Sequence, residues 1–344
     1  MFVTFFLTRR HLCRIFLTEY TQLKALCQAF SAGGSMEKGE VNYLVGIGGW
    51  EHEVFDDCFY PHANLAPAEK LSYYAGFFET VEVRPTFWDE SLKAEDAKPW
   101  IDAVAHARTF LFNVKLHSLF THKRTVKRDV AENTQGILRL LQERGRLGAL
   151  LMQFPYAFTN TSSNRLHLAR LAEIFRGFPI HVELRHDSWH SPSLKNFLAE
   201  NILLPVSADM PRVKHLMPFS PNVAGETAYL RLHGRNEKGW LLDNIEARYD
   251  YLYNNRELQE LRRRLEALSA HCKQVIIICN NTTDGKAVAT ALQLTSMLRS
   301  DKAGMKPLAV PAATFNAFPV LHDIATPYEQ QASLFAASGY REAM

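Results

Sequence analysis

The chain has 344 residues, of which 47% are hydrophobic and 22% are charged, and this composition excludes collagen-like, coiled-coil and wholly disordered proteins. The length suits either two domains or one large α/β barrel. The 39 basic and 36 acidic residues leave a formal charge of only +3, so bulk charge does not indicate a nucleic-acid partner and any basic site must be local.

The cysteines follow neither a disulfide nor a zinc-binding pattern. They are odd in number, widely spaced and without a C-x-x-C pair: Cys13, Cys27, Cys58, Cys272 and Cys279. We therefore expect a reducing, cytoplasmic location. No apolar run reaches the roughly 18 to 20 residues that cross a bilayer, so we expect no membrane partner. The sequence gives no indication of an oligomeric state.

Residues 1–35 differ in composition from the rest of the chain. They carry four basic residues against one acidic residue, Glu19, and end in the Gly- and Ser-containing stretch 31–35. This composition suits an organellar presequence or an interfacial helix, but Met36 stands just before a charged segment and a strong strand pattern. We expect residues 1–35 to be an extension outside the fold.

From Val41 onward, short β-branched runs alternate with longer stretches of helical spacing, a pattern that demands a parallel sheet. Leu258, Leu261 and Leu265, for example, mark one apolar helix face. The alternation occurs eight times and predicts an α/β fold, an eight-stranded parallel (β/α)8 TIM barrel over residues 41–300. The predicted strands are Tyr43–Gly48, Thr80–Arg84, Thr109–His117, Ala149–Phe154, Ile180–Arg185, Leu203–Asp209, Ala228–His233 and Gln274–Asn280.

An open doubly wound sheet would show the same alternation. However, no Gly-x-Gly-x-x-Gly turn follows the first strand, since residues 46–50 lack the third glycine. We therefore favour the closed barrel. The proline-containing segment 301–344 is expected to be a tail that packs on the barrel surface.

Polar residues two apart lie near the ends of four predicted strands. In such a barrel the active site lies at the carboxyl ends of the strands. Residues of equal parity, which lie two apart along a strand, point to the same side of the sheet. Buried charges are costly unless they are paired or meet a ligand. The candidates are Glu82 and Arg84, Lys115 and His117, Glu183 and Arg185, and Arg231 and His233, with Gln153, Asp209, Asn280 and Asn281 on other strands.

Two interpretations of these strand ends compete. Each Glu-x-Arg can be an ion pair that plugs the barrel end, or the set can line a ligand pocket. Because the cations outnumber the carboxylates, we favour a pocket for an anionic, phosphate-bearing ligand held between Arg185, Arg231 and Lys115. Four further cations in the loop 121–128, and aromatic residues after the strands, including Trp50 and Trp189, are expected near the mouth.

A metal site is a less favoured alternative. His117, Glu183, Asp209 and His233 have suitable ligand types, but an arginine two residues after Glu183 competes for its carboxylate. We therefore expect no metal or other cofactor.

Lys115 offers a second alternative chemistry. It would serve as a Schiff-base amine if neighbouring arginines depressed its pKa, although a strand lysine is more often an anion ligand.

The motifs at the strand ends resemble those of the domain-of-unknown-function 72 family, the YecE-like proteins. The resemblance covers about 44 to 298 and implies a TIM barrel, but it implies no reaction. Compared with the family pattern, Arg84 replaces an asparagine and Tyr156 replaces a second proline, which predicts a pocket of altered charge and shape. The matching segments are 46–50, 73–74, 78–83, 86–88, 112–115, 121–122, 153–155, 182–186, 188–189, 229–234, 280–281 and 284–285.

Two functional hypotheses follow. In the first, the protein is a hydrolase or isomerase that holds an anionic substrate while Glu82 or Glu183 and His117 or His233 move protons. In the second, it is a non-catalytic protein that binds nucleic acid or a nucleotide through the same cations and the loop aromatics. The two differ in whether a carboxylate and a histidine reach the same bound atom.

Overall fold

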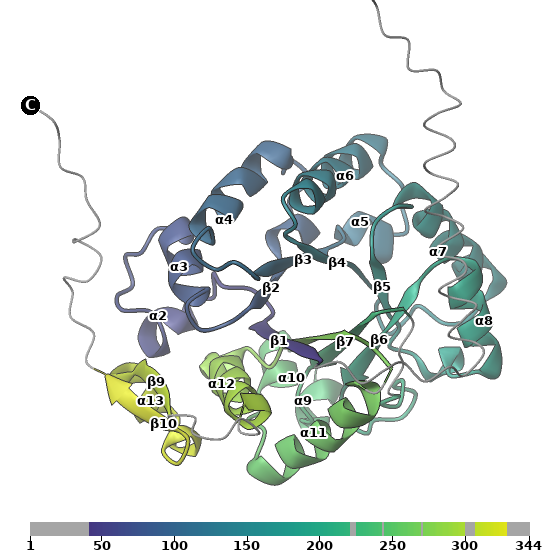
Figure 1. Ribbon diagram of the computed structural model, residues 1–344. Helices are drawn as coiled ribbons and strands as arrows, with labels where there is room; N and C mark the ends of the chain where they lie inside the picture. The colour runs from purple at the N-terminus through teal and green to yellow at the C-terminus, as the bar shows by residue number, and fades with distance from the viewer. Residues whose placement is uncertain (1–40, 221–224, 243, 270, 300–306, 329–344) are drawn as a thin grey trace, which may run out of the picture.

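The computed structural model describes residues 41–220, 225–242, 244–269, 271–299 and 307–328 (Figure 1). The predicted extension 1–35 lies outside the described residues. None of the described helices has the length and apolar character needed to cross a membrane.

Eight parallel strands close into a barrel in which each strand pairs with the next and β8 pairs with β1 (Figure 1). This topology confirms the predicted (β/α)8 fold. Every predicted strand is present, with each end within two residues of the observed one. The strands are β1 (Asn42–Ile47), β2 (Thr80–Val83), β3 (Leu111–Lys115), β4 (Leu147–Gln153), β5 (Ile180–Glu183), β6 (Leu204–Asp209), β7 (Thr227–Leu232) and β8 (Gln274–Cys279).

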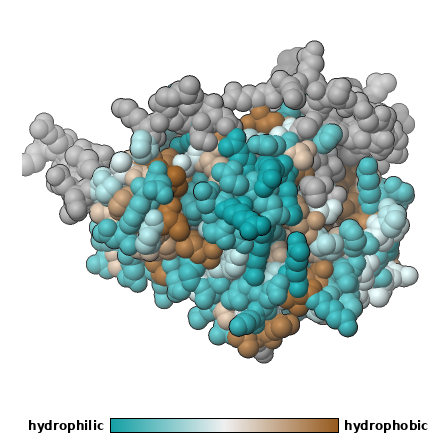
Figure 2. Space-filling model, turned by 90° about the horizontal axis from the view of Figure 1, so that it is seen from below, coloured by the Kyte–Doolittle hydropathy of each residue, from teal (hydrophilic) through white to brown (hydrophobic). Residues whose placement is uncertain are grey.

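Helices surround the barrel and cover its outer face (Figure 1). In α11, the residues at helical spacing, Leu258, Leu261, Leu265 and Leu268, are all buried, as predicted. Figure 2 shows a face on which hydrophilic residues predominate and hydrophobic residues form smaller strips. The helices are α2 (Val54–Cys58), α3 (Pro67–Tyr74), α4 (Lys98–Ala103), α5 (Ser118–Thr121), α6 (Arg128–Glu143), α7 (Ser162–Ile174), α8 (Pro192–Glu200), α9 (Glu237–Leu241), α10 (Ile245–Tyr249), α11 (Asn255–Ser269) and α12 (Lys286–Arg299).

The interior of the barrel changes from apolar to charged along the strands. Leu44, Ala149, Tyr229, Ile276 and Ile278 form a separate buried cluster inside the barrel. Glu82, Glu183 and Arg231 are buried further along β2, β5 and β7. Because side chains alternate across a strand, the parity that places Tyr229 inside the barrel also places Arg231 there. Apolar and charged side chains therefore share the barrel interior, and the charged ones lie toward the carboxyl ends of their strands.

The tail contains regular structure that the sequence analysis did not predict. Strands β9 (Leu308–Pro311) and β10 (Ala325–Tyr328) form a two-stranded parallel sheet, and helix α13 (Ala312–Ala317) follows β9. Thr314 donates a hydrogen bond to the carbonyl oxygen of Cys58 in α2 at 2.7 Å. The described part of the tail, residues 307–328, therefore packs against the barrel's outer layer.

Gly46 permits a close approach of β1 and β2. A Cβ atom at this position would lie 1.9 Å from the carbonyl oxygen of Thr80, which belongs to the backbone of the neighbouring strand. We expect Gly46→Ala to lower the free energy of unfolding by about 3 kcal/mol, because the strand must shift to relieve the clash. Chemical denaturation measures this change.

Gly136→Ala is the matched control. Gly136 lies inside α6, and a Cβ atom there would come no closer than 3.7 Å to its nearest neighbour, Ala94. This substitution should raise stability by up to about 1 kcal/mol, because alanine favours the helix. Equal stability of the parent and Gly46→Ala would contradict the packing argument.

Candidate functional site

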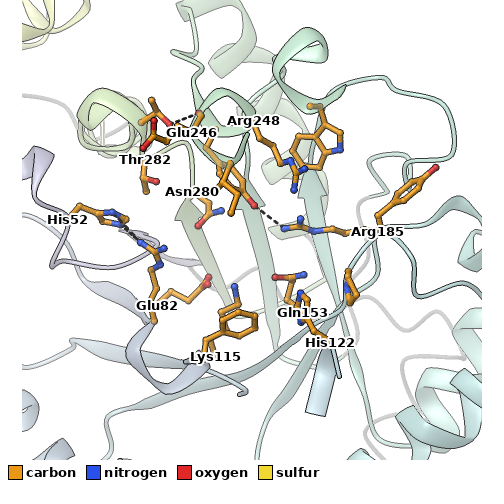
Figure 3. A pocket seen from close by; sticks show the side chains of 18 of the residues that line it. His52, Glu82, Lys115, His122, Gln153, Arg185, Glu246, Arg248, Asn280 and Thr282 are labelled. Carbon is orange, nitrogen blue, oxygen red and sulfur yellow. Dashed lines mark hydrogen bonds between the residues drawn. The ribbon is translucent and has the colours of Figure 1, made fainter. Parts of the chain in front are cut away.

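A cavity of about 1230 Å³ opens at the carboxyl ends of the barrel strands (Figure 3). Its lining comes from the strand ends and from the loops that follow them, including α10. Six of the fourteen predicted site residues line it: Glu82, Arg84, Lys115, Gln153, Arg185 and Asn280. Strands β2, β3, β4, β5 and β8 each bring one or two of these side chains to the same space.

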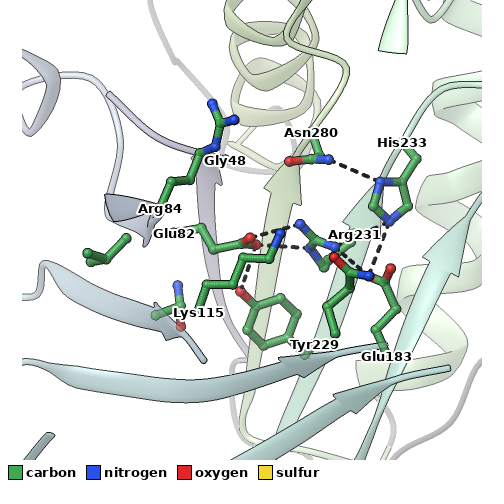
Figure 4. Close-up of polar contacts among 12 residues, drawn as sticks. Gly48, Glu82, Arg84, Lys115, Glu183, Tyr229, Arg231, His233 and Asn280 are labelled. Atoms are coloured by element: carbon green, nitrogen blue, oxygen red, sulfur yellow. Dashed lines mark hydrogen bonds and ion pairs between the residues drawn. The ribbon is translucent and has the colours of Figure 1, made fainter. Parts of the chain in front are cut away.

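Arg231 lies beneath this cavity, and its side chain connects two carboxylates (Figure 4). Its Nε and Nη2 donate to the two carboxylate oxygens of Glu82 at 2.9 and 2.8 Å. Its Nη1 donates to Glu183 at 2.5 Å. All three side chains are almost fully buried. Arg231 therefore serves as the internal counterion of two carboxylates rather than as the direct anion ligand that the sequence analysis predicted.

Glu183 and His233 are also held in this network. Glu183 accepts hydrogen bonds from Arg185 Nε at 2.8 Å and from His233 Nε2 at 3.1 Å. The amide of Asn280 lies 3.1 Å from the other ring nitrogen of His233 (Figure 4). Both ring nitrogens of His233 are thus engaged, and the ring is fully buried.

The protonation states follow from this burial. Burial alone would raise the pKa of Glu183, but Arg231, His233 and Arg185 together hold it well below its usual range. Burial lowers the pKa of His233 to about 4 despite the neighbouring Glu183. At neutral pH, Glu183 is therefore ionised and His233 is neutral. Neither group is poised to exchange a proton with a ligand.

The interpretation of each Glu-x-Arg as an internal ion pair is correct for β5 and wrong for β2. Glu183 and Arg185 on β5 form the expected pair. Glu82 instead binds Arg231, and the Nη1 of Arg84 lies 2.9 Å from the nearer ring nitrogen of His52. Arg84 therefore remains at the cavity without a carboxylate partner among the described residues.

Two predicted ligand-binding residues point away from the cavity, because each lies one position after an inward-facing residue near the end of a strand. Asp209 follows Ala208 and lies outside the barrel, where it binds Arg235 at 2.8 Å and accepts from Tyr253 at 2.7 Å. Asn281 follows Asn280 and donates to Tyr251 and Thr290. Neither side chain therefore lines the cavity, in contrast to the prediction that both contact a ligand there.

Three other predicted residues lie where the chain has already turned away from a strand. His117 caps α5 by accepting from the backbone of Leu119 at 3.1 Å. Trp189 is fully buried and stacks on Phe158. Trp50 is also buried and lines a smaller side cavity beside Arg84. None of the three lines the main cavity.

The four residues of the metal alternative do not converge. Glu183 and His233 are in contact, but Asp209 and His117 are engaged elsewhere as described above. Within the part of the chain that the structure describes, a different set brings three potential metal ligands close together: His186, Asp187 and His215.

Sequence reasoning missed several residues of the cavity wall. Arg248 and Tyr249 belong to α10 in the long connection after β7 and line the cavity. Arg248 lies over the ring of Trp240, 5.3 Å from its centroid, and its buried Nε has no hydrogen-bond partner among the described residues. No strand periodicity marks this segment, so its position after a strand was the sole available signal.

The basic loop 121–128 contributes less than predicted. His122 lines the cavity, but Lys127 and Arg128 form exposed ion pairs with Glu90 and Glu132. Such exposed pairs contribute little to stability or binding.

The cavity is cationic at its floor and acidic at its mouth. The floor holds Lys115 and Arg185, and its carboxylate, Glu82, is already bound by Arg231. The other four carboxylates that line the cavity are exposed: Glu51, Glu53, Glu246 and Asp284. The electrostatic potential is therefore more positive deep in the cavity than at its mouth.

Comparisons with known proteins identify the family. The model of a protein family described as "Protein of unknown function DUF72" matches residues 44–314. The chain belongs to the DUF72 family. The DUF72 chain is 28% identical to the UPF0759 protein YunF of Bacillus subtilis over 281 residues, which cover 76% of this chain and 97% of YunF.

Two solved DUF72 structures share the fold. The Thermotoga maritima protein TM1631 is 30% identical, with a TM-score of 0.67 over 75% of this chain and 99% of that one. The Enterococcus faecalis protein EF0366 is 25% identical, with a TM-score of 0.62 over 76% of this chain and 99% of that one. These relatives support the fold and the family and leave the ligand open.

The network around Arg231 yields a stability prediction for this DUF72 protein. We expect Arg231→Met to lower the free energy of unfolding by about 3 to 5 kcal/mol, because Glu82 would remain buried without its counterion and Glu183 would keep only Arg185. Arg263→Met, at an exposed position of α11, is the control and should change it by no more than about 0.5 kcal/mol. Urea denaturation compares the variants.

The loss in Arg231→Met should depend on pH. In the parent, the lowered pKa of Glu183 stabilises the fold above its ordinary value of 4.5, and this contribution is lost as pH falls through the folded-state pKa. In the variant, Glu183 keeps Arg185 and His233 but loses Arg231, so its pKa is lowered less. The stability difference between parent and variant should therefore shrink below about pH 4.5. A constant difference would contradict the electrostatic origin.

Proposed function

We propose that the cavity binds a small ligand carrying a phosphate or another anionic group at the carboxyl ends of the strands. The observation that carries this proposal is the set of cations Arg84, Lys115 and Arg248, which line the cavity and form no ion pair with any described carboxylate. Desolvated like charges repel one another, and a bound anion relieves that repulsion.

The geometry of the arginines suits such a ligand. The guanidinium group offers planar, bidentate donors that match phosphate or carboxylate. Arg84 is positioned by His52, and Arg248 by its stacking on Trp240. Arg84 lines the cavity from the end of β2, and Arg248 lines it from α10. The two arginines are therefore held in place before a ligand arrives.

The mouth of the cavity favours a small ligand over a nucleic acid. Trp88, Leu241 and Ile245 line it and are 62%, 73% and 68% exposed. Such apolar surface suits an apolar or aromatic part of a ligand. The exposed carboxylates at the mouth would repel a continuous phosphate backbone. A nucleotide remains compatible with this site, whereas a nucleic-acid polymer is disfavoured.

The predicted acid–base pairs do not support the hydrolase or isomerase hypothesis. Glu183 and His233 are locked in the buried network, and His117 caps a helix. Glu82 reaches the cavity, but both of its oxygens accept from Arg231. The proposal is therefore one of binding, and any reaction must use other groups of the cavity wall.

The proposal predicts which arginines control affinity. Arg84→Gln and Arg248→Gln should each weaken the binding of inorganic phosphate or of adenosine monophosphate tenfold or more. Each substitution removes a charge-assisted hydrogen bond of about 1.5 to 3 kcal/mol. Isothermal titration calorimetry measures the affinities at constant ionic strength.

Lys123→Gln is the matched control. Lys123 is an exposed residue of the loop 121–128 and does not line the cavity. Its substitution should leave the affinity unchanged. A large loss in Lys123→Gln with unchanged affinity in both arginine variants would move the site to the exterior loop and favour a nucleic-acid surface.

A further inference from the structure

Lys115 differs from the other cations of the cavity in its surroundings. It is the last residue of β3, and its side chain points into the cavity (Figure 3). Its Nζ lies 4.1 Å from the centroid of the Phe87 ring, and no described carboxylate lies within ion-pair distance. The amine is thus held against an apolar face and open to a ligand.

The backbone fixes this position firmly. Lys115 pairs with Leu151 of β4, and its carbonyl oxygen accepts a hydrogen bond from Thr86 at 2.8 Å. The same Phe87 ring also contacts the imidazole of His122, with 5.1 Å between the ring centroids. Lys115 therefore presents its amine from a rigid strand beside a second titratable group of the cavity wall.

The electrostatic surroundings favour the neutral amine. Burial lowers the pKa of Lys115 to about 7; Arg231 and Arg185 act in the same direction, and Glu82 and Glu183 oppose them. About half of the molecules therefore carry an uncharged amine at neutral pH. An uncharged amine has the free electron pair that a nucleophile requires.

We propose that Lys115 forms a Schiff base with an aldehyde or ketone that also carries an anionic group. This inference rests on the proposed anion binding, since Arg84 and Arg248 would hold the anionic group while Nζ meets the carbonyl carbon. The substrate class is thus a phosphorylated or carboxylated carbonyl compound.

The step balances without an oxidant or reductant. The electron pair of Nζ forms a bond to the carbonyl carbon; Nζ then loses one proton and the carbonyl oxygen takes one, which gives a carbinolamine. A second proton on the hydroxyl group lets it leave as water, and the electron pair of Nζ forms the carbon–nitrogen double bond of the protonated Schiff base. One water molecule is released for each Schiff base formed.

Two groups of the cavity wall can exchange these protons. Burial lowers the pKa of His122 to about 4, so its ring is neutral at pH 7 and can accept a proton. Tyr249 lies with its hydroxyl 3.4 Å from Arg185. Burial alone would raise the pKa of Tyr249, but Arg185 lowers it below its usual value, which favours proton release.

The test uses pyridoxal 5′-phosphate, which carries both an aldehyde and a phosphate, followed by borohydride reduction and peptide mass spectrometry. We expect the reduced adduct on Lys115 at several-fold higher occupancy than on Lys123 or Lys214, which are exposed. Excess inorganic phosphate should suppress the adduct on Lys115. Pyridoxal, which lacks the phosphate, should label Lys115 several-fold less.

Two variants keep the test specific. Lys115→Arg retains a cation but has no primary amine that can form the adduct, so it should lose the label. Lys214→Arg removes a lysine at the cavity mouth and should leave the labelling of Lys115 unchanged. Circular dichroism of both variants checks that they are folded.

The pH dependence gives a second readout. Labelling of Lys115 should rise with pH and level off just above pH 7, whereas labelling of exposed lysines should keep rising toward their ordinary pKa of about 10.4. The charged and titratable groups around Lys115 are Glu82 on β2 and Arg84 after it, Glu183 on β5 and Arg185 after it, Arg231 on β7 and His122.

The outcomes separate the two proposals. Preferential labelling of exposed lysines, with normal phosphate affinity in calorimetry, would overturn the Schiff base and leave Lys115 as an anion ligand. Absence of phosphate binding by the parent would overturn the proposed function itself. Labelling of Lys115 that phosphate does not suppress would contradict an anion-bearing substrate.

Discussion

The bridge from Arg231 to Glu82 and Glu183 is the interaction on which the site depends. It joins strands β2, β5 and β7 across the barrel interior, where water is excluded and an unpaired charge is costly. The guanidinium group satisfies both carboxylates at once, with Nε and Nη2 on Glu82 and Nη1 on Glu183. Replacing Arg231 would leave Glu82 without an ion-pair partner among the described residues and Glu183 with Arg185 alone. The position of these strands and the charge of the interior are therefore fixed together.

This bridge also determines the charge of the cavity above it. Because Arg231 already binds the carboxylate of Glu82, that carboxylate is not free to neutralise Arg84 or Lys115. The positive charge of Arg231 further lowers the pKa of Lys115. One buried arginine thus leaves the floor of the cavity cationic and favours the neutral form of its lysine. The proposed anion binding and the proposed nucleophilic chemistry at Lys115 therefore have the same physical origin.

The fold and much of the cavity floor were predictable because strand periodicity determines both. Equal parity along β2, β3, β5 and β7 placed Glu82, Lys115, Arg185 and Arg231 inside the barrel correctly. The prediction failed where parity was not applied, as at Asp209 and Asn281, which follow inward residues and face the helices. It also failed beyond the strand ends. There the path of a loop decides which way a side chain faces, so the sequence did not reveal Arg248 or Tyr249 as part of the wall.

The two predicted departures from the family pattern both occur in the cavity wall. Arg84 and Tyr156 line the cavity, one near its floor and the other partly exposed at its edge. Neither contacts the carboxylates that bind Arg231, so a change at either position alters the charge or shape of the wall without breaking the buried bridge. An asparagine in place of Arg84 would remove one cation from the wall and leave Lys115 in place. Substitutions in the wall should therefore change the proposed ligand binding more than the stability of the barrel, whereas substitutions in the buried bridge should do the reverse.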